Sequence, residues 1–146
     1  MKSIKSSGAF SVGFPSASEM DKIDYLGVET GYNSDKLKDI GYTVTRGEQV
    51  YAPVINELHL NFECEVIHTA VVGGHTLISG EIKNILADET ILDEKNKIII
   101  PKLDPVIYDE EGMAYYHLGE KLSTPPYKAG ADLKRHFFNF LKANHY

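Results

Sequence analysis

The sequence is poor in residues that could cross-link the chain or anchor it in a membrane. It holds one cysteine and no tryptophan among 146 residues, and no apolar run approaches the roughly 20 residues that a membrane span needs. A single cysteine cannot form a disulfide within the chain, which is typical of a reducing compartment. The start, MKSIKSSGAF, is interrupted by serine and glycine before the apolar core of a secretory signal could form. We therefore expect a cytoplasmic protein without a membrane partner.

Positive charge is also scarce. The chain has 15 Lys and Arg against 21 Asp and Glu, for a net charge of −6. Phosphate backbones are held chiefly by Lys and Arg, so this balance argues against a nucleic-acid partner. The composition, with 42% apolar and 25% charged residues, is that of an ordinary globular domain. A chain of this length can bury roughly 70% of its unfolded surface, so we expect one domain with a real core.

The stretch from Asn61 to Leu86 has the pattern of a β-hairpin. From Leu58 to Val66 every second residue is apolar, which is typical of a strand with one face in the core and the other in water. The positions predicted to face water are His59, Asn61, Glu63 and Glu65. Gly73 and Gly74 suit the turn because glycine reaches positive φ without strain. Ile78, Gly80, Ile82 and Leu86 would then share one face of the second strand.

Shorter elements are expected on both sides of the hairpin. Before it, we predict a strand over residues 10–14, a helix from Ser16 or Ser18 that ends at Gly27, a helix of barely two turns from Asn33 or Ser34 to Gly41, and a strand over 42–45. After it, we predict short strands or crossings over 98–101, 105–108 and 113–118, a linker over 123–129, and a helix over 131–141 whose large apolar stripe must be buried.

Few residues suggest chemistry by pattern alone. Cys64 lies on the apolar face between Glu63 and Glu65, so a buried structural thiol is favoured over a nucleophile, which needs cationic neighbours. No Cys and His spacing typical of a metal site is present. The segment from Asn33 to Lys36 could bind an anionic or carbonyl ligand, but a capped surface helix explains it as well, and the pattern alone favours that alternative. A turn histidine such as His75 is more often exposed than functional.

Several blocks in order resemble the flavin reductase-like, FMN-binding split-barrel family, which includes flavoredoxins and NAD(P)H:flavin oxidoreductases. They are SGAFSVGFPS, YLGVETGYNSDKL, YAPVINE, NFEC with GGHTLISGEI, LADETILDE and KLDPVIYDEEGMAYYHLGEKL. The resemblance covers residues 5–122 and implies a mainly β fold, a β-barrel with peripheral helices, over 1–122, followed by the linker and C-terminal helix of 123–146. The family's pattern includes a further N-terminal portion with the first barrel strands and much of the flavin contact. We expect a longer gene product or a shortened relative with an incomplete flavin site.

The resemblance also implies site residues. It places Ser34, Asp35 and Lys36 beside FMN, with the Lys36 charge favouring the reduced, anionic flavin. It likewise places His75 near the flavin, as a contact to a ring carbonyl or to the phosphate. It also places an aromatic ring beside the flavin, which is either Tyr115 or Tyr116, and we choose Tyr116. His117 is a weaker candidate. Because adjacent strand residues face opposite ways, only one of the two tyrosines can face the ligand.

Three functions remain open. In the first, NADH or NADPH hands a hydride to bound FMN, which passes electrons to free flavin, a redox protein or a metal ion, and no side chain acts as acid or base. In the second, the protein carries electrons on FMN without a nicotinamide site. In the third, the shortened barrel has lost flavin and serves as an interaction protein. The family resemblance further implies a homodimer with flavin near the interface. A hydrolase that uses Cys64 and a histidine is a distant fourth.

Overall fold

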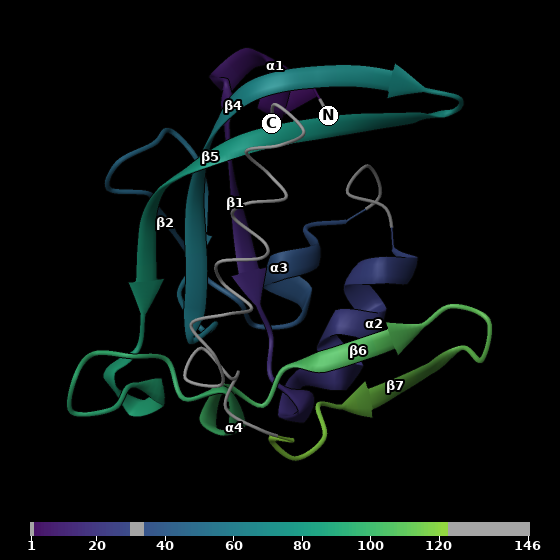
Figure 1. The fold of residues 1–146 in the computed structure, drawn as a ribbon. Coiled ribbons are helices and arrows are strands. Elements are labelled where there is room, and N and C mark those ends of the chain that lie inside the picture. Colours follow the sequence, from purple (N-terminus) through teal and green to yellow (C-terminus); the bar gives the residue numbers. More distant parts are fainter. Residues whose placement is uncertain (1, 30–33, 123–146) are drawn as a thin grey trace, which may run out of the picture.

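A long, curved hairpin forms the frame of the structure. The computed structural model describes residues 2–29 and 34–122, so the predicted linker and helix of 123–146 lie outside the described residues. Strand β4 (Leu60–Val72) pairs antiparallel with β5 (His75–Ala87), and Gly73 makes the turn at a φ of 59° (Figure 1). The predicted hairpin is therefore confirmed. Each strand has 13 residues, and register shifts between Glu63 and Cys64 and between Val66 and His68 bend the ribbon.

The first half of β4 carries a third strand. Strand β1 (Ala9–Phe14) pairs antiparallel with it, from Phe14 opposite Leu60 to Ala9 opposite Glu65, so that the sheet order is β1-β4-β5. Two separate ribbons accompany this sheet, β2 (Val44–Arg46) with β3 (Pro53–Ile55) and β6 (Val106–Asp109) with β7 (Ala114–His117). The prediction of a mainly β fold is confirmed.

Short helices link the strands. They are α1 (Lys2–Ser7), the 3-10 turn η1 (Ala17–Glu19), α2 (Met20–Val28), α3 (Lys36–Asp39), the 3-10 turn η2 (Glu89–Ile91) and α4 (Ile100–Leu103). In Figure 1, α2 and α3 lie on the same side of β1, and the β6–β7 ribbon runs below α2. No helix in the described ranges has the length and apolar character to cross a membrane.

Several helix and strand limits differ from the sequence predictions, and the strand predicted over 42–45 lies at Val44–Arg46. Residues 98–101 do not form a strand: Ile98 makes only an isolated bridge to Leu92, and α4 begins at Ile100. Pro101 explains this, because proline lacks an amide hydrogen and fits the first turn of a helix. The predicted two-turn helix before Gly41 has only one turn, α3, and α2 continues through Gly27 to Val28.

The core lies at one end of the hairpin. Leu60, Ile91 and Leu103 are buried together, and Phe14 and Phe62 pack against them. The rings of the two phenylalanines also contact each other, with their centroids 4.7 Å apart. The far half of the hairpin is different, because its large apolar side chains are exposed on both strands: Ile67, Val71, Val72 and Leu77. We call residues 67–78 the hairpin arm. The described residues thus bury one compact end of the sheet and leave its other end open.

The polar face of β4 is not in water, which corrects the prediction for Asn61 and Glu63. Asn61 is 4% exposed and Glu63 is 0% exposed. The loop of residues 47–52 covers this face, and its backbone amides donate to the Glu63 carboxylate: Glu48 at 3.1 Å, Gln49 at 2.7 Å and Val50 at 3.1 Å. The Asn84 side-chain amide, from β5, donates at 3.1 Å. We call residues 47–52 the anchored loop, because a buried carboxylate fixes it to the sheet.

These hydrogen bonds decide the ionisation of Glu63. Burial disfavours the charged form, but the amides of Gln49, Glu48 and Val50 and the side chain of Asn84 outweigh it and hold the pKa of Glu63 below its ordinary value. A carboxyl group whose pKa is lowered on folding stabilises the fold above its unfolded-state pKa. That stabilisation is lost as the pH falls through the folded-state pKa.

We expect Glu63→Gln to lower the free energy of unfolding at neutral pH by about 3 kcal/mol. The glutamine amide carries no charge, and its NH₂ group would face the loop N–H groups that now donate to the carboxylate. Urea denaturation of both proteins between neutral and acidic pH would measure this. The difference in free energy of unfolding between the wild type and the variant should shrink in acid, because Glu63 becomes protonated there. A constant gap at every pH would contradict the role of the ionised carboxylate.

Candidate functional site

Three of the predicted cofactor-binding residues lie together at α3. Asp35 precedes the helix, Lys36 opens it, and Ser34 stands just before them. The Lys36 ammonium donates to the carbonyl oxygen of Leu26 at 2.6 Å, which ties α3 to the C-terminal end of α2. In the described part of the chain, no carboxylate forms an ion pair with Lys36. Within the described ranges its positive charge therefore has no carboxylate partner.

Ser34 has an unusual environment. Its Oγ is buried and completes no hydrogen bond of standard geometry with a described residue. The Tyr25 phenol lies nearby and donates to Asp39 at 2.9 Å; this bond raises the pKa of Tyr25, and the Ser34 hydroxyl acts in the opposite direction. A buried hydroxyl has hydrogen-bonding capacity that a bound polar group can use, so Ser34 is a candidate contact for such a group.

The structure does not gather the remaining predicted residues at α3. His75 is exposed at the start of β5, opposite Val72 in the hairpin arm, and Tyr116 is 55% exposed on β7. Figure 1 places the turn of the hairpin arm and the β6–β7 ribbon at opposite ends of the molecule. Residues 34–36, His75 and Tyr116 therefore lie on three separate elements, and their common role at a flavin stays a prediction.

The neighbours of Tyr116 have clear roles. Tyr115 packs on Tyr108 with ring centroids 4.8 Å apart, and its hydroxyl donates to Asp24 of α2 at 3.4 Å. Of the two adjacent rings, Tyr115 is thus the one directed toward α2. His117 Nδ1 lies 2.9 Å from Asp104 Oδ1 and lines a hollow of about 280 Å³ with Ile100 and Pro105. The choice of Tyr116 remains untested.

Cys64 is a buried thiol. It is 4% exposed, and burial raises its pKa. A thiol of raised pKa is a poor nucleophile at neutral pH. The prediction that it lies in the core is confirmed.

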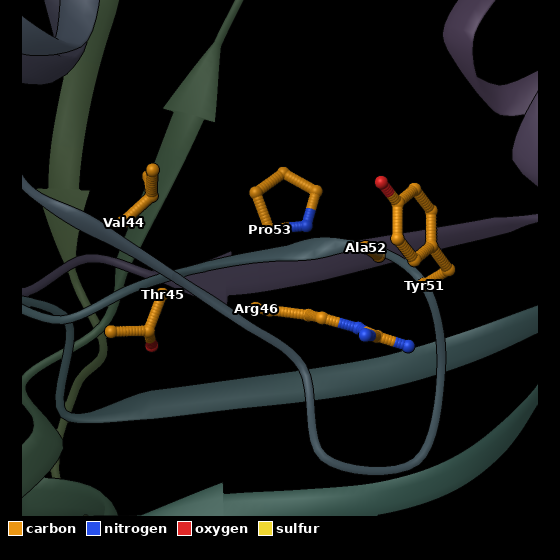
Figure 2. A pocket seen from close by; sticks show the side chains of 6 residues that line it. All are labelled: Val44, Thr45, Arg46, Tyr51, Ala52 and Pro53. Carbon is orange, nitrogen blue, oxygen red and sulfur yellow. The ribbon is translucent and has the colours of Figure 1, made fainter.

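A hollow that the sequence did not reveal lies between β2 and β3. It has a volume of about 300 Å³ and is lined by Val44, Thr45, Arg46, Tyr51, Ala52 and Pro53 (Figure 2). The Arg46 guanidinium stands over the Tyr51 ring, 4.9 Å from its centroid. We call this the Arg46 hollow. The signal that could have pointed to it is modest: Arg46 is one of two arginines in an acidic chain and precedes a glycine and a nearby tyrosine.

A second hollow, of about 410 Å³, also lies against the anchored loop. Gln49, Val50 and Tyr51 line it together with Glu65 and Lys83. Lys83 is neutralised there, because its ammonium lies 2.7 Å from Glu81 Oε2 and 3.0 Å from Glu65 Oε2. Tyr51 lines both hollows, so the position of the anchored loop shapes both.

Solved structures with a similar fold include two flavoredoxins and a flavin reductase. The chain is 34% identical to the flavoredoxin of Desulfovibrio vulgaris (Miyazaki F), with a TM-score of 0.81, over 88% of this chain and 69% of that one. The flavoredoxin of Methanosarcina acetivorans is 31% identical, with a TM-score of 0.78, over 88% of this chain and 67% of that one. A putative flavin reductase with a split-barrel domain from Shewanella frigidimarina shares the fold at 19% identity and a TM-score of 0.72, over 86% of this chain and 64% of that one.

The fold and these likenesses define a mainly β protein of the split-barrel class. The flavin reductase like domain model matches residues 1–117, and the chain belongs to that family. An uncharacterized protein of Archaeoglobus fulgidus is 30% identical over 95 residues, which are 65% of this chain and 54% of that protein. The chain spans about half the length of the curated relatives that it matches.

We expect Gly47→Ala to destabilise the fold, because a Cβ at Gly47 would lie 2.8 Å from Glu63 Oε2 and 2.9 Å from the Val50 carbonyl oxygen. Such overpacking of the anchored loop costs about 1 to 3 kcal/mol. Gly27→Ala in α2 is the matched control, since among the described residues no atom outside its chain neighbours and its own helix backbone lies within 4 Å of its Cβ position, and alanine favours a helix by about 1 kcal/mol. Chemical denaturation of both variants would test this. Equal stability of the two would show that Glu63 does not hold the loop tightly.

Proposed function

We propose that the protein is an FMN-binding oxidoreductase that passes electrons from NADH or NADPH through the flavin to an acceptor. Its membership of the flavin reductase-like family and its likeness to two flavoredoxins support this proposal. The observation that carries it is the pairing of the buried Ser34 hydroxyl with the Lys36 ammonium, which has no carboxylate partner among the described residues. We further propose a cytoplasmic location, and free flavin or a redox protein as the acceptor.

The residues at α3 fit a polar, anionic ligand such as FMN. The buried Ser34 hydroxyl can donate to an oxygen of the ligand. The Lys36 ammonium has three N–H donors, of which one donates to the Leu26 carbonyl, so two can donate to a ligand. Asp35 stays exposed beside them and begins the helix. We assign Ser34, Asp35 and Lys36 to holding the flavin.

The chemistry of electron transfer belongs to the cofactor. Bound FMN would accept a hydride from the nicotinamide and release the electrons to the acceptor. The side chains of this protein orient the ligand and supply charge, and none is assigned as an acid or a base. His75 and Tyr116 are kept in the proposal as flavin contacts, since the family resemblance implies them.

A second candidate is an electron carrier that holds FMN without oxidising nicotinamide. The two flavoredoxins, at 34% and 31% identity, favour it as much as they favour the reductase. Oxidation of NADH and NADPH, followed with added FMN, distinguishes the two. Consumption of either nicotinamide in proportion to the protein supports the reductase. Flavin binding without consumption supports the carrier, and a colourless protein that does not bind FMN contradicts both.

We expect Lys36→Ala to weaken FMN binding by about 1 to 3 kcal/mol, the range of a charge-assisted hydrogen bond. Quenching of flavin fluorescence during titration would give the affinity. Lys38→Ala is the control, because Lys38 is exposed on the same helical turn and removes the same charge. Lys36→Arg keeps the charge and should retain part of the affinity. Equal affinities for the wild type and both alanine variants would remove Lys36 from the site.

We also propose that two chains pair through the hairpin arm. Val71 is 78% exposed there, and Ile67, Val72 and Leu77 are exposed with it. Apolar surface grouped on one projecting element is typical of a protein interface. Sedimentation equilibrium should give the mass of two chains at micromolar concentration. A single-chain mass at every concentration would contradict the pairing and leave the flavin proposal untouched.

A further inference from the structure

We propose that the Arg46 hollow binds the phosphorylated adenosine end of the nicotinamide cofactor. The inference rests on the proposed function, since it names where the electron donor is held. None of the residues predicted to contact flavin lines this hollow, so it would be a separate subsite.

The hollow has the form and surface that a purine ring needs. Its volume of about 300 Å³ lies at the lower end of the range of small-molecule sites. Apolar walls come from Val44, Ala52 and Pro53, and the buried Ala52 forms part of the base. In Figure 2, Pro53 stands between Val44 and Tyr51, with the Arg46 side chain extending toward the tyrosine. A flat aromatic ring can pack on such walls, whereas a strongly hydrated ligand would gain little from them.

Arg46 supplies the charge that a phosphate needs. In the described ranges of the chain, no carboxylate is ion-paired with Arg46. Its guanidinium is instead placed over the Tyr51 ring, which leaves the N–H donors at its edge available. A guanidinium binds phosphate oxygens through two parallel hydrogen bonds, which an ammonium cannot do. An uncompensated arginine in a chain of net charge −6 thus marks the hollow as a site for an anion.

The second hollow provides an internal comparison. It is larger, but Glu65 and Glu81 neutralise Lys83, the lysine that lines it. A phosphate entering it would meet two carboxylates beside one ammonium. Charge therefore assigns a phosphorylated ligand to the Arg46 hollow and not to its neighbour.

The anchored loop holds the hollow in shape before a ligand arrives. Tyr51 is 67% exposed, so its own packing does not fix it. Three amides of the same loop are bound to Glu63 at its centre, and the Gly47 amide donates to the Ala52 carbonyl at 2.8 Å across its ends. A preformed site loses less conformational entropy on binding, which raises affinity for a small ligand.

The test measures binding of adenosine, 5′-ADP and 2′,5′-ADP to the wild type, Arg46→Ala, Arg46→Lys and Lys95→Ala by isothermal titration calorimetry. Lys95 is an exposed lysine after η2, outside the hollow, and its loss changes the net charge equally. We expect Arg46→Ala to weaken binding of the preferred phosphorylated compound about tenfold, Arg46→Lys to weaken it less, and Lys95→Ala to leave it unchanged. Adenosine should bind more weakly and should not depend on Arg46.

The two phosphorylated compounds distinguish the two sources of the phosphate. Preference for 2′,5′-ADP would show that Arg46 binds the 2′-phosphate, which only NADPH carries. Equal or better binding of 5′-ADP would show that Arg46 binds the pyrophosphate, which NADH and NADPH share. Equal affinities for the wild type and Arg46→Ala, or a wild type that binds neither compound, would overturn the proposal. FMN titration of the same variants keeps the two proposals apart. Loss of FMN binding in every protein overturns the proposed function, whereas unchanged nucleotide binding in Arg46→Ala overturns only the subsite.

Discussion

The buried carboxylate of Glu63 is the constraint on which the rest of the structure depends. It projects from the central strand of the β1-β4-β5 sheet into a cage of three backbone amides and one side-chain amide. An ionised group without exposure is tolerated only when hydrogen bonds replace its water. Meeting that requirement bends the anchored loop over the sheet, and the loop in turn sets Tyr51 against Arg46. The shape of the surface hollows therefore depends on the buried Glu63 carboxylate.

The sequence predicted the elements well where local pattern decides them. Period-two alternation and the glycine pair located β4, β5 and their turn. It failed where a distant segment decides burial. The alternating pattern predicts that Glu63 lies on the face of β4 opposite to Leu60 and Phe62. That face is buried only because a loop about 14 residues earlier in the chain covers it. Pro101 similarly favoured the first turn of α4 over a strand.

The candidate site was predictable in the same uneven way. Ser34, Asp35 and Lys36 are adjacent in sequence, so any structure holds them together, and the structure adds that the Ser34 hydroxyl is buried. His75 and Tyr116 came from family resemblance, which gives no geometry, and they lie on elements at opposite ends of the molecule. Arg46 and Tyr51 escaped notice because their meeting depends on the anchored loop. The family is that of flavin reductase-like domains, and the chain spans 69% of the flavoredoxin that it resembles.

Recognition of FMN at α3 is the proposal on which the function of this chain rests. Backbone amide shifts of the ¹⁵N-labelled protein, followed by NMR during titration with FMN, test it most directly. The account predicts saturable shifts that are largest at Ser34, Asp35 and Lys36, with little change in the anchored loop. Saturable shifts centred elsewhere, or no shift at any FMN concentration, would contradict it.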